Sequence, residues 1–227
     1  MGRFRKKGIS SRLKRFSHPP YVILLLMLIL GCYRMFSSAG GNFKVVVPQK
    51  VYRSGQPTPG QLREWTKKYG IKTVINLRGD VEQAVRDEQA AADELGLKMI
   101  TMTLSSRRLP AKYLLIELIG HIETAEPPVL LHCRSGIDRS GTAGALAAFA
   151  IGDIPYEKAK WQAYVAPGPW KRRKYEHRDY PDDYLHISDV FRLYEKYCKK
   201  NNLDTNNWQQ FKQWVHDTNS LPEKEPE

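Results

Sequence analysis

The stretch that decides the fold is Leu130-Leu131-His132-Cys133-Arg134-Ser135-Gly136-Ile137-Asp138-Arg139-Ser140-Gly141. The apolar run from Val129 to Leu131 is typical of a buried strand, and the small residues from Thr142 to Ala150 predict a helix. Between them lies a short loop with two glycines. Backbone N–H groups in such a loop, in front of a helix N-terminus, form a concave site for an anion. The sequence therefore predicts an anion-binding loop between a strand and a helix.

Three side chains of this loop indicate nucleophilic chemistry on a bound oxyanion. The positive field of the loop stabilises a thiolate, so we expect Cys133 to have a lowered pKa and to act as the nucleophile. Arg139 can offer a bidentate fork to two oxygens of a tetrahedral oxyanion. The hydroxyl of Ser140 can assist the thiolate when it leaves. The remaining loop positions are assigned to substrate binding: Arg134, Ser135, Gly136 and Ile137.

The pattern His132-Cys133-(x5)-Arg139-Ser140 resembles the signature loop of the cysteine-dependent protein tyrosine and dual-specificity phosphatases. The resemblance implies an α/β fold with a central, mostly parallel sheet flanked by helices. It also implies a phosphocysteine intermediate and no metal or other cofactor. We expect His132 to hydrogen-bond the loop and to help hold Cys133 as a thiolate. The alternative is a buried cysteine at a strand end, with Arg139 in an ordinary surface pair.

Strands and helices alternate along the rest of the chain, which favours a parallel sheet with right-handed crossovers. One helix is expected from Pro59 to Gly70, with Thr58 and Gln61 forming a capping box. The other expected strands are residues 45–47, 50–52, 72–77 and 97–103. The other expected helices are residues 81–95, 110–124, 156–165, 182–199 and 207–216.

A second phrase supports the same resemblance. The residues Tyr52-Arg53-Ser54-Gly55-Gln56-Pro57, followed by Thr73-Val74-Ile75-Asn76-Leu77-Arg78, resemble the opening of small bacterial, plant and fungal dual-specificity-like phosphatases. In that resemblance Arg53 is structural or borders the active site, and the alternative is an ordinary turn arginine. Arg78 and Asp80 follow a buried strand whose C-terminal end faces the cleft of an α/β sheet, so both are candidate substrate-binding residues. For Asp80 the alternative is a cap of the next helix.

The proton donor is the main departure from the family pattern. The loop of residues 104–110, where many related phosphatases carry an aspartate general acid, contains no acidic residue. Asp138 is the best candidate acid, because it precedes Arg139 inside the signature loop, and Asp80 is the reserve. The Asp-Arg ending resembles loops of phosphoinositide phosphatases and of some bacterial phosphatases with mixed protein and lipid specificity. The alternative for Asp138 is an internal brace that fixes the loop or pairs with Arg139.

Charge and hydropathy identify a separate N-terminal segment. The net charge is +12, but seven positive charges precede residue 16, so the remainder has an ordinary excess and nucleic-acid binding is not expected. The apolar run from Tyr21 to Tyr33 would rise only about 20 Å as a helix, against a bilayer core near 30 Å. This pattern is typical of a secretory signal or signal anchor. The residues Ile29-Leu30-Gly31-Cys32 also resemble a bacterial lipoprotein cleavage box.

These observations predict four parts: a membrane-targeting segment (1–33), a linker (34–44), a phosphatase domain (45–217) and a mobile tail (218–227). Basic residues before the apolar run predict that this end stays cytoplasmic. The catalytic domain would then lie outside the cytoplasm, on the periplasmic side of a bacterial inner membrane. Its tether would be a helix or a lipid on Cys32. Cys198 repeats at helical intervals with apolar residues, which indicates a packed core thiol.

The predicted function is a metal-independent phosphomonoester hydrolase that acts through a phosphocysteine. The predicted substrates are a phosphoprotein, a phosphoinositide or an inositol phosphate. Two alternatives remain at this point. One is a rhodanese-like sulfurtransferase, which also uses a cysteine loop on an α/β scaffold. The other is a catalytically weak phosphate-binding module, suggested by the acid missing from residues 104–110.

Overall fold

The computed structural model describes residues 22, 24, 25, 28, 41–80, 82–164 and 185–224. The chain divides into two units, residues 1–38 and 39–227, and the second holds a five-stranded sheet in the order β1-β2-β5-β3-β4. The β1 strand runs antiparallel to β2, and the other neighbours are parallel. The predicted α/β fold with a mostly parallel sheet is therefore confirmed. The strands are β1 (Lys44–Val47), β2 (Val51–Ser54), β3 (Thr73–Asn76), β4 (Lys98–Thr101) and β5 (Val129–His132).

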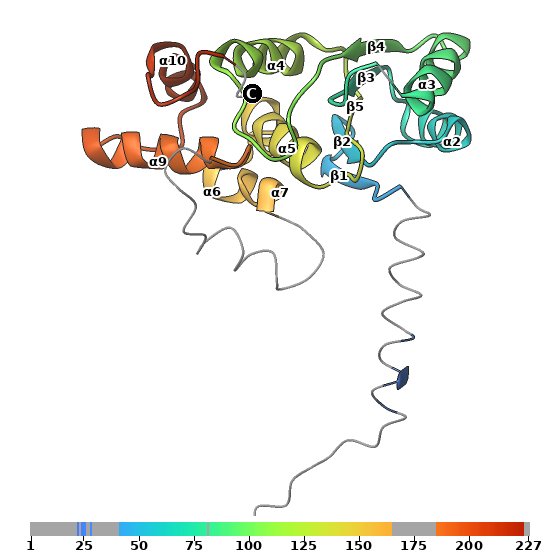
Figure 1. Ribbon diagram of the computed structural model, residues 1–227, viewed down its shortest axis with the longest axis horizontal. Helices are drawn as coiled ribbons and strands as arrows, with labels where there is room; N and C mark the ends of the chain where they lie inside the picture. Colours follow the sequence, from blue (N-terminus) through green and yellow to red (C-terminus); the bar gives the residue numbers. More distant parts are fainter. Residues whose placement is uncertain are drawn as a thin grey trace, which may run out of the picture. The chain divides into compact units, whose positions relative to one another are not determined.

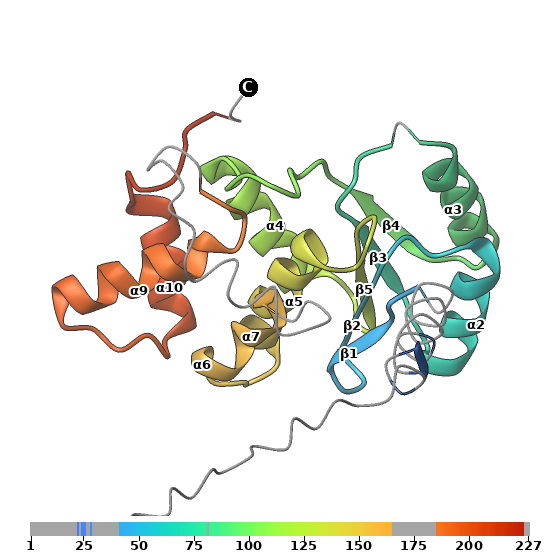
Figure 2. The same ribbon diagram turned by 60° about the horizontal axis from the view of Figure 1, so that its bottom comes forward.

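Helices cover both faces of this sheet (Figures 1 and 2). The helices α2 (Pro59–Tyr69) and α3 (Gln83–Glu94) lie on one face. The helices α4 (Lys112–Thr124) and α5 (Asp138–Ile151) lie on the other. The remaining helices lie on the α5 side and are α6 (Tyr156–Ala159), α7 (Trp161–Tyr164), α9 (Asp189–Asn201) and α10 (Trp208–Asp217).

Strand alternation decides which side chains reach each face. Val74 and Leu130 are fully buried in the cluster that includes residues of α2 and α3. Their neighbours Ile75 and Leu131 are fully buried in the larger cluster that includes residues of α4 and α5. Because Arg53 pairs with Leu131 in the β2–β5 register, alternation directs its side chain to the α5 face. The next residue on β5, His132, is directed to the α3 face.

The α2 helix ends where its sequence predicts. The Thr58 hydroxyl accepts from the Gln61 N–H at 3.2 Å, and the Gln61 side chain accepts from the Thr58 N–H at 3.0 Å. Gly70 ends the helix at φ 67°, a left-handed conformation that glycine adopts at little cost. The capping box and the glycine stop are therefore both confirmed.

Differences from the expected structure are found in the helices expected over 81–95, 156–165 and 182–199. The helix expected over 81–95 begins at Gln83 with Glu82 as its N-cap, so the alternative interpretation of Asp80 as a helix cap is wrong. The helix expected over 156–165 is two short helices, α6 and α7, because the chain turns at Lys160 although its apolar pattern continues. The helix expected from residue 182 begins at Asp189, whose carboxylate accepts the His186 N–H at 2.7 Å and so fixes the turn before it.

Both ends of the domain extend beyond the boundaries expected from the sequence. Phe43 falls in the expected linker, but its ring stacks on Tyr69 with 4.9 Å between centroids. Residues 218–224 fall in the expected mobile tail, yet Leu221 is buried and the Pro222 carbonyl accepts the Lys112 N–H at 2.7 Å. Apolar contacts with the domain explain both differences. Cys198 is buried in the larger core cluster, as predicted.

Within the described residues, no helix is both long enough and apolar enough to cross a membrane. The predicted targeting segment lies mostly outside these residues, as does Cys32, and only Val22, Leu24, Leu25 and Leu28 of its apolar run are described.

Replacing Leu130 with alanine is expected to destabilise the domain by about 2–5 kcal/mol, because Leu130 is fully buried in the middle of the sheet. The matched control is Leu203→Ala, whose side chain is 39% exposed. It should change the free energy of unfolding by no more than about 0.5 kcal/mol. Urea denaturation followed by circular dichroism measures both values. Equal losses would contradict this placement of the core.

Candidate active site

The candidate site lies where β5 meets α5. Cys133 follows the last residue of β5, and α5 begins at Asp138, four residues earlier than the expected start at Thr142. Asp138, Arg139 and Ser140 therefore lie in the first helical turn rather than in a loop. The N-cap residue Ile137 makes no side-chain capping bond, so the positive end of this helix can serve an anion through its backbone N–H groups.

Residues outside the loop between β5 and α5 donate hydrogen bonds to the carbonyl oxygens of this loop. The Asn42 side-chain amide donates to the carbonyls of Ser135 and Gly136, both at 3.0 Å. The Gln56 N–H donates to the Arg134 carbonyl at 3.2 Å. With these carbonyls turned outward, the N–H groups of the same peptides are directed toward the concave side of the loop. This backbone arrangement is the one that the predicted anion cradle requires.

Gly136 is required for this shape. Its φ of 69° lies in the left-handed region, and an added Cβ would sit 2.5 Å from the Gly55 nitrogen and 2.7 Å from the Ser54 carbonyl carbon. Both neighbours are backbone atoms that no rotamer change can move. The loop therefore packs directly on the chain that follows β2, and only glycine fits at position 136.

Cys133 is buried, and its surroundings favour the thiolate. Its side chain is 2% exposed, and its Sγ lies 3.5 Å from the Ser140 Oγ. Burial on its own raises the pKa of the thiol. Several groups outweigh burial and lower this pKa below its ordinary value. They are the hydrogen bond from the Ser140 hydroxyl, the hydrogen bonds from the backbone N–H groups of Ser140 and Ile137, and the charge of Arg139.

Arg139 is anchored by main-chain oxygens. Its Nη1 donates to the Leu77 carbonyl at 3.1 Å and to the Leu104 carbonyl at 3.2 Å. Its Nε is buried and has no protein partner. Nη1 is thus fixed by the chain that follows β3 and by the chain that follows β4. The Nε group is available to a tetrahedral oxyanion.

Arg53 is the main site residue that the sequence left unresolved. It is fully buried, its Nη1 lies 3.5 Å from the Gly136 carbonyl, and its Nε and Nη2 have no hydrogen-bond partner. Burial lowers the pKa of Arg53, and the negative charge of Cys133 raises it in part. A buried guanidinium is costly unless an anion compensates it. Arg53 is therefore placed as a counter-ion beneath the loop and is no ordinary turn arginine.

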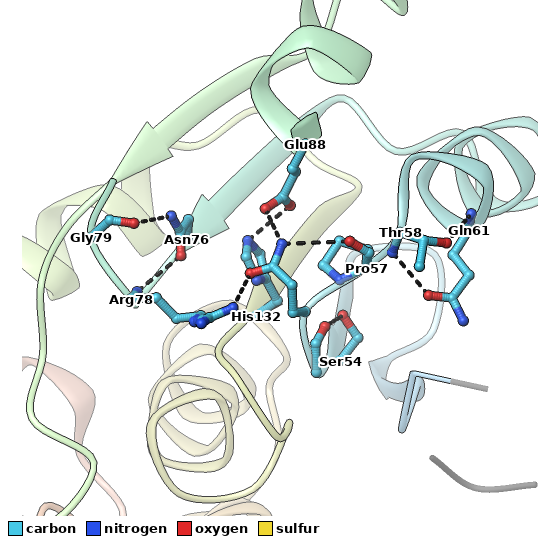
Figure 3. A network of polar contacts seen from close by, with 11 residues as sticks. Ser54, Pro57, Thr58, Gln61, Asn76, Arg78, Gly79, Glu88 and His132 are labelled. Carbon is cyan, nitrogen blue, oxygen red and sulfur yellow. Dashed lines mark hydrogen bonds and ion pairs between the residues drawn. The ribbon is translucent and has the colours of Figure 1, made fainter. Parts of the chain in front are cut away.

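His132 contacts a different partner from the one expected. Its Nε2 lies 2.9 Å from Oε1 of Glu88 on α3, and both side chains are fully buried (Figure 3). Neither ring nitrogen forms a hydrogen bond with the loop. The expectation that His132 hydrogen-bonds the loop is wrong, because alternation along β5 turns it to the face opposite Arg53. The contact with Glu88 is an ion-pair distance and not a well-directed hydrogen bond.

Glu88 extends this contact to the candidate substrate residue Arg78. The Gln56 amide donates to Glu88 Oε2 at 2.6 Å, and Arg78 Nη1 donates to Gln56 Oε1 at 2.6 Å. Arg78 also pairs with Glu82, whose pKa is lowered by that hydrogen bond. Arg78 thus belongs to a chain of polar contacts that supports β5 (Figure 3).

The other predicted residues lie at the surface of the site. Arg134 and Ser135 are exposed, and Ile137 and Asp138 are half-buried. Asp80 is exposed and lines a cavity of about 400 Å³ at the ends of β3 and β4. The structure therefore places Asp138, Arg139 and Ser140 on the first turn of α5, with the Cys133 sulfur 3.5 Å from the Ser140 hydroxyl. It places Asp80 on a neighbouring loop.

A family model described as "DSP-PTPase phosphatase fused to NAD+ Kinase" matches residues 34–149, which include the whole loop and the first twelve residues of α5. The chain belongs to this family. It is a phosphatase of the cysteine-dependent dual-specificity and tyrosine phosphatase superfamily, and thus a hydrolase. The sulfurtransferase alternative is thereby excluded.

Solved structures similar to this phosphatase include three phosphatase domains. A mutant form of Tk-PTP is 20% identical, with 70% of this chain and 97% of that chain covered and a TM-score of 0.49. The catalytic core of the PP-IP phosphatase SIW14 from S. cerevisiae is 20% identical (71% and 93% covered, TM-score 0.44). A variant of TpbA from P. aeruginosa, in complex with pTyr, is 18% identical (54% and 77% covered, TM-score 0.43). A search of curated proteins gave no match.

Replacing Arg53 with methionine in the phosphatase is expected to raise the pKa of Cys133. The positive charge of Arg53 stabilises the thiolate, so its loss should move the pH midpoint of Cys133 alkylation by iodoacetamide upward by about one unit. Arg53→Lys keeps the charge and should shift the midpoint less. Cys133→Ser gives the background from other thiols. A folded Arg53→Met protein with the wild-type midpoint would contradict the counter-ion assignment.

Proposed function

We propose that this phosphatase hydrolyses phosphomonoesters through a phosphocysteine formed on Cys133. The observation that carries the proposal is the Cys133 thiolate site, which combines a lowered pKa with Arg139 and a ring of backbone N–H groups. A phosphoryl dianion fits this cradle in charge and shape. The site uses its own cations for this purpose, so the proposed reaction requires no metal or other cofactor.

In the first step the Cys133 sulfur attacks phosphorus, the S–P bond forms, and the bond from phosphorus to the leaving oxygen breaks. Arg139 and the loop N–H groups hold the equatorial oxygens, where charge is greatest in the transition state. Asp138 gives its proton to the leaving oxygen, a transfer that contributes about two to four orders of magnitude in rate. Its position in the first turn of α5, directly before Arg139, supports this assignment.

In the second step water attacks phosphorus, the S–P bond breaks, and Asp138 takes a proton from that water. The Ser140 hydroxyl, 3.5 Å from Sγ, stabilises the departing thiolate by donating a hydrogen bond. The site then regains its starting protonation state and releases inorganic phosphate.

The proposed substrates are a phosphoprotein, a phosphoinositide or an inositol phosphate. All present the same tetrahedral dianion to the loop. Arg134 and Arg107 are exposed and offer positive charge to substrate groups outside the loop. Loop residues Ser135, Gly136 and Ile137 contribute backbone N–H groups.

Replacing Cys133 with serine is expected to abolish hydrolysis of aryl phosphates by the full chain, because the weakly nucleophilic hydroxyl cannot form the intermediate. Cys198→Ser is the matched control, since Cys198 is buried in the core and its pKa is raised by burial. The wild-type protein quenched during turnover should carry phosphate on the Cys133 peptide in mass spectrometry.

Activity near the wild-type level in Cys133→Ser would overturn the proposed mechanism. Vanadate binding to the wild-type protein without turnover of any phosphomonoester would instead identify a phosphate-binding module.

We also propose that residues 1–33 attach this domain to a membrane and place it on the periplasmic side of a bacterial inner membrane. The support is the sequence pattern: a basic segment followed by the apolar run from Tyr21 to Tyr33. The tether is a helix or a lipid on Cys32.

Fractionation of bacteria that express the full chain is expected to recover the protein in membranes. Detergent should release it, whereas high salt should not, because an apolar segment holds it. A chain that begins at residue 39 is the soluble control. Loss of membrane recovery in Cys32→Ala would identify a lipid anchor, and unchanged recovery a helical one. A wholly soluble product of unprocessed mass would contradict the proposal.

A further inference from the structure

A histidine from the C-terminal part of the chain lies beside the candidate acid. His186 Nε2 is 3.9 Å from Oδ1 of Asp138, and the two side chains are 9% and 22% exposed. His186 lies outside the residues that the family model matches. It therefore adds a titratable group to the edge of the site that the signature loop does not contain.

The hydrogen bonds of the ring define which nitrogen carries the proton. The backbone N–H of Ser188 donates to His186 Nδ1 at 3.2 Å, so Nδ1 is an acceptor and carries no proton. The Ser188 hydroxyl lies 2.8 Å from the same nitrogen and shares this acceptor. The proton of the neutral ring is consequently on Nε2, the nitrogen that faces Asp138.

The segment that carries His186 is fixed on the acid-free loop. The Leu185 carbonyl accepts the Leu109 N–H at 2.7 Å, which joins this segment to the end of the 104–110 loop. The His186 N–H donates to the Asp189 carboxylate at the start of α9. The loop that lacks an acid is thus bonded to the segment that brings a histidine to Asp138.

We propose that His186 is a positioning residue for Asp138 in the leaving-group proton transfer. This inference rests on the proposed phosphatase mechanism and extends it to a residue outside the signature loop. In the reaction, the Nε2–H of His186, which lies 3.9 Å from Oδ1, holds the Asp138 carboxyl group in its orientation.

Every proton in this step is accounted for without a further reactant. Asp138 starts as a neutral acid and gives its proton to the leaving oxygen as the bond to phosphorus breaks. The carboxylate that forms faces the Nε2–H of His186 across 3.9 Å and is attracted by it electrostatically, while His186 keeps its own proton. When water attacks the phosphocysteine, Asp138 takes one proton from it and returns to the neutral acid. His186 thus orients Asp138 without exchanging a proton.

A purely structural role for His186 makes a different prediction, because its two nitrogens serve different partners. Asparagine places its amide near the position of Nδ1, so His186→Asn retains polar contact with Ser188 and loses the donor toward Asp138. Glutamine reaches the position of Nε2, so His186→Gln retains that donor and loses contact with Ser188. The two variants therefore separate the positioning of Asp138 from the support of the turn before α9.

The experiment compares the full chain with its variants on phenyl phosphate, a poor leaving group, and 4-nitrophenyl phosphate, an activated one. We expect His186→Asn to lower kcat on phenyl phosphate about tenfold, and on 4-nitrophenyl phosphate less than about threefold, with KM unchanged. His186→Gln should keep most of the wild-type kcat on both. Asp138→Asn should show the same leaving-group dependence with a larger loss, and adding His186→Asn to it should cost nothing further.

Several results would overturn the inference while leaving the phosphatase mechanism intact. These are an equal loss on both substrates in His186→Asn, a loss in His186→Gln greater than in His186→Asn, and additive losses in the double variant. Thermal unfolding of each variant identifies any that fail to fold, and for those His186→Phe, which fills the site without a donor, replaces the asparagine. Failure of the mechanism itself would be seen separately, as full activity in Cys133→Ser.

Discussion

The rest of this site depends on one buried group, the sulfur of Cys133, whose surroundings favour the negatively charged thiolate. Burial opposes that charge, so the surrounding structure must supply hydrogen bonds and positive groups that outweigh the loss of water. The first turn of α5 and Arg139 provide them from the substrate side, and Arg53 provides a full charge from beneath. Arg53 and the Cys133 thiolate would each be costly as an isolated charge in the core, but together they stabilise each other. This mutual dependence explains why an arginine lies fully buried without a carboxylate hydrogen-bonded to it.

Two layers of support meet at β5. On its α5 face, alternation directs Arg53 of the neighbouring strand toward the loop. On its α3 face, it directs His132 toward Glu88, which continues through Gln56 to Arg78. The position of Cys133, which follows β5, therefore depends on the contacts of this strand with both α3 and α5.

Residues that are close in sequence were predictable, and residues joined by long-range contacts were not. Cys133, Arg139 and Ser140 occur at fixed spacing between a strand and a helix, so their meeting follows from local structure. The partner of His132 depends on the packing of α3 against β5, and no local pattern identifies Glu88. The contact between His186 and Asp138 depends on how α9 is placed relative to α5. The start of α5 was missed because Asp138 and Arg139 have the composition of a loop, although their N–H groups serve an anion.

The anchoring of Arg139 by the carbonyls of Leu77 and Leu104 also bears on how this enzyme can diverge. A carbonyl oxygen is present whatever side chain the residue carries, so exchanges of the exposed side chains near Leu77 and Leu104 leave both acceptors in place. The orientation of the arginine is thus insulated from mutation in the loop that follows β4. Side chains of the 104–110 loop can be exchanged to suit a different substrate while Arg139 keeps its orientation toward the phosphate. Such a division between a fixed main-chain support and variable side chains makes this loop a suitable place to engineer specificity.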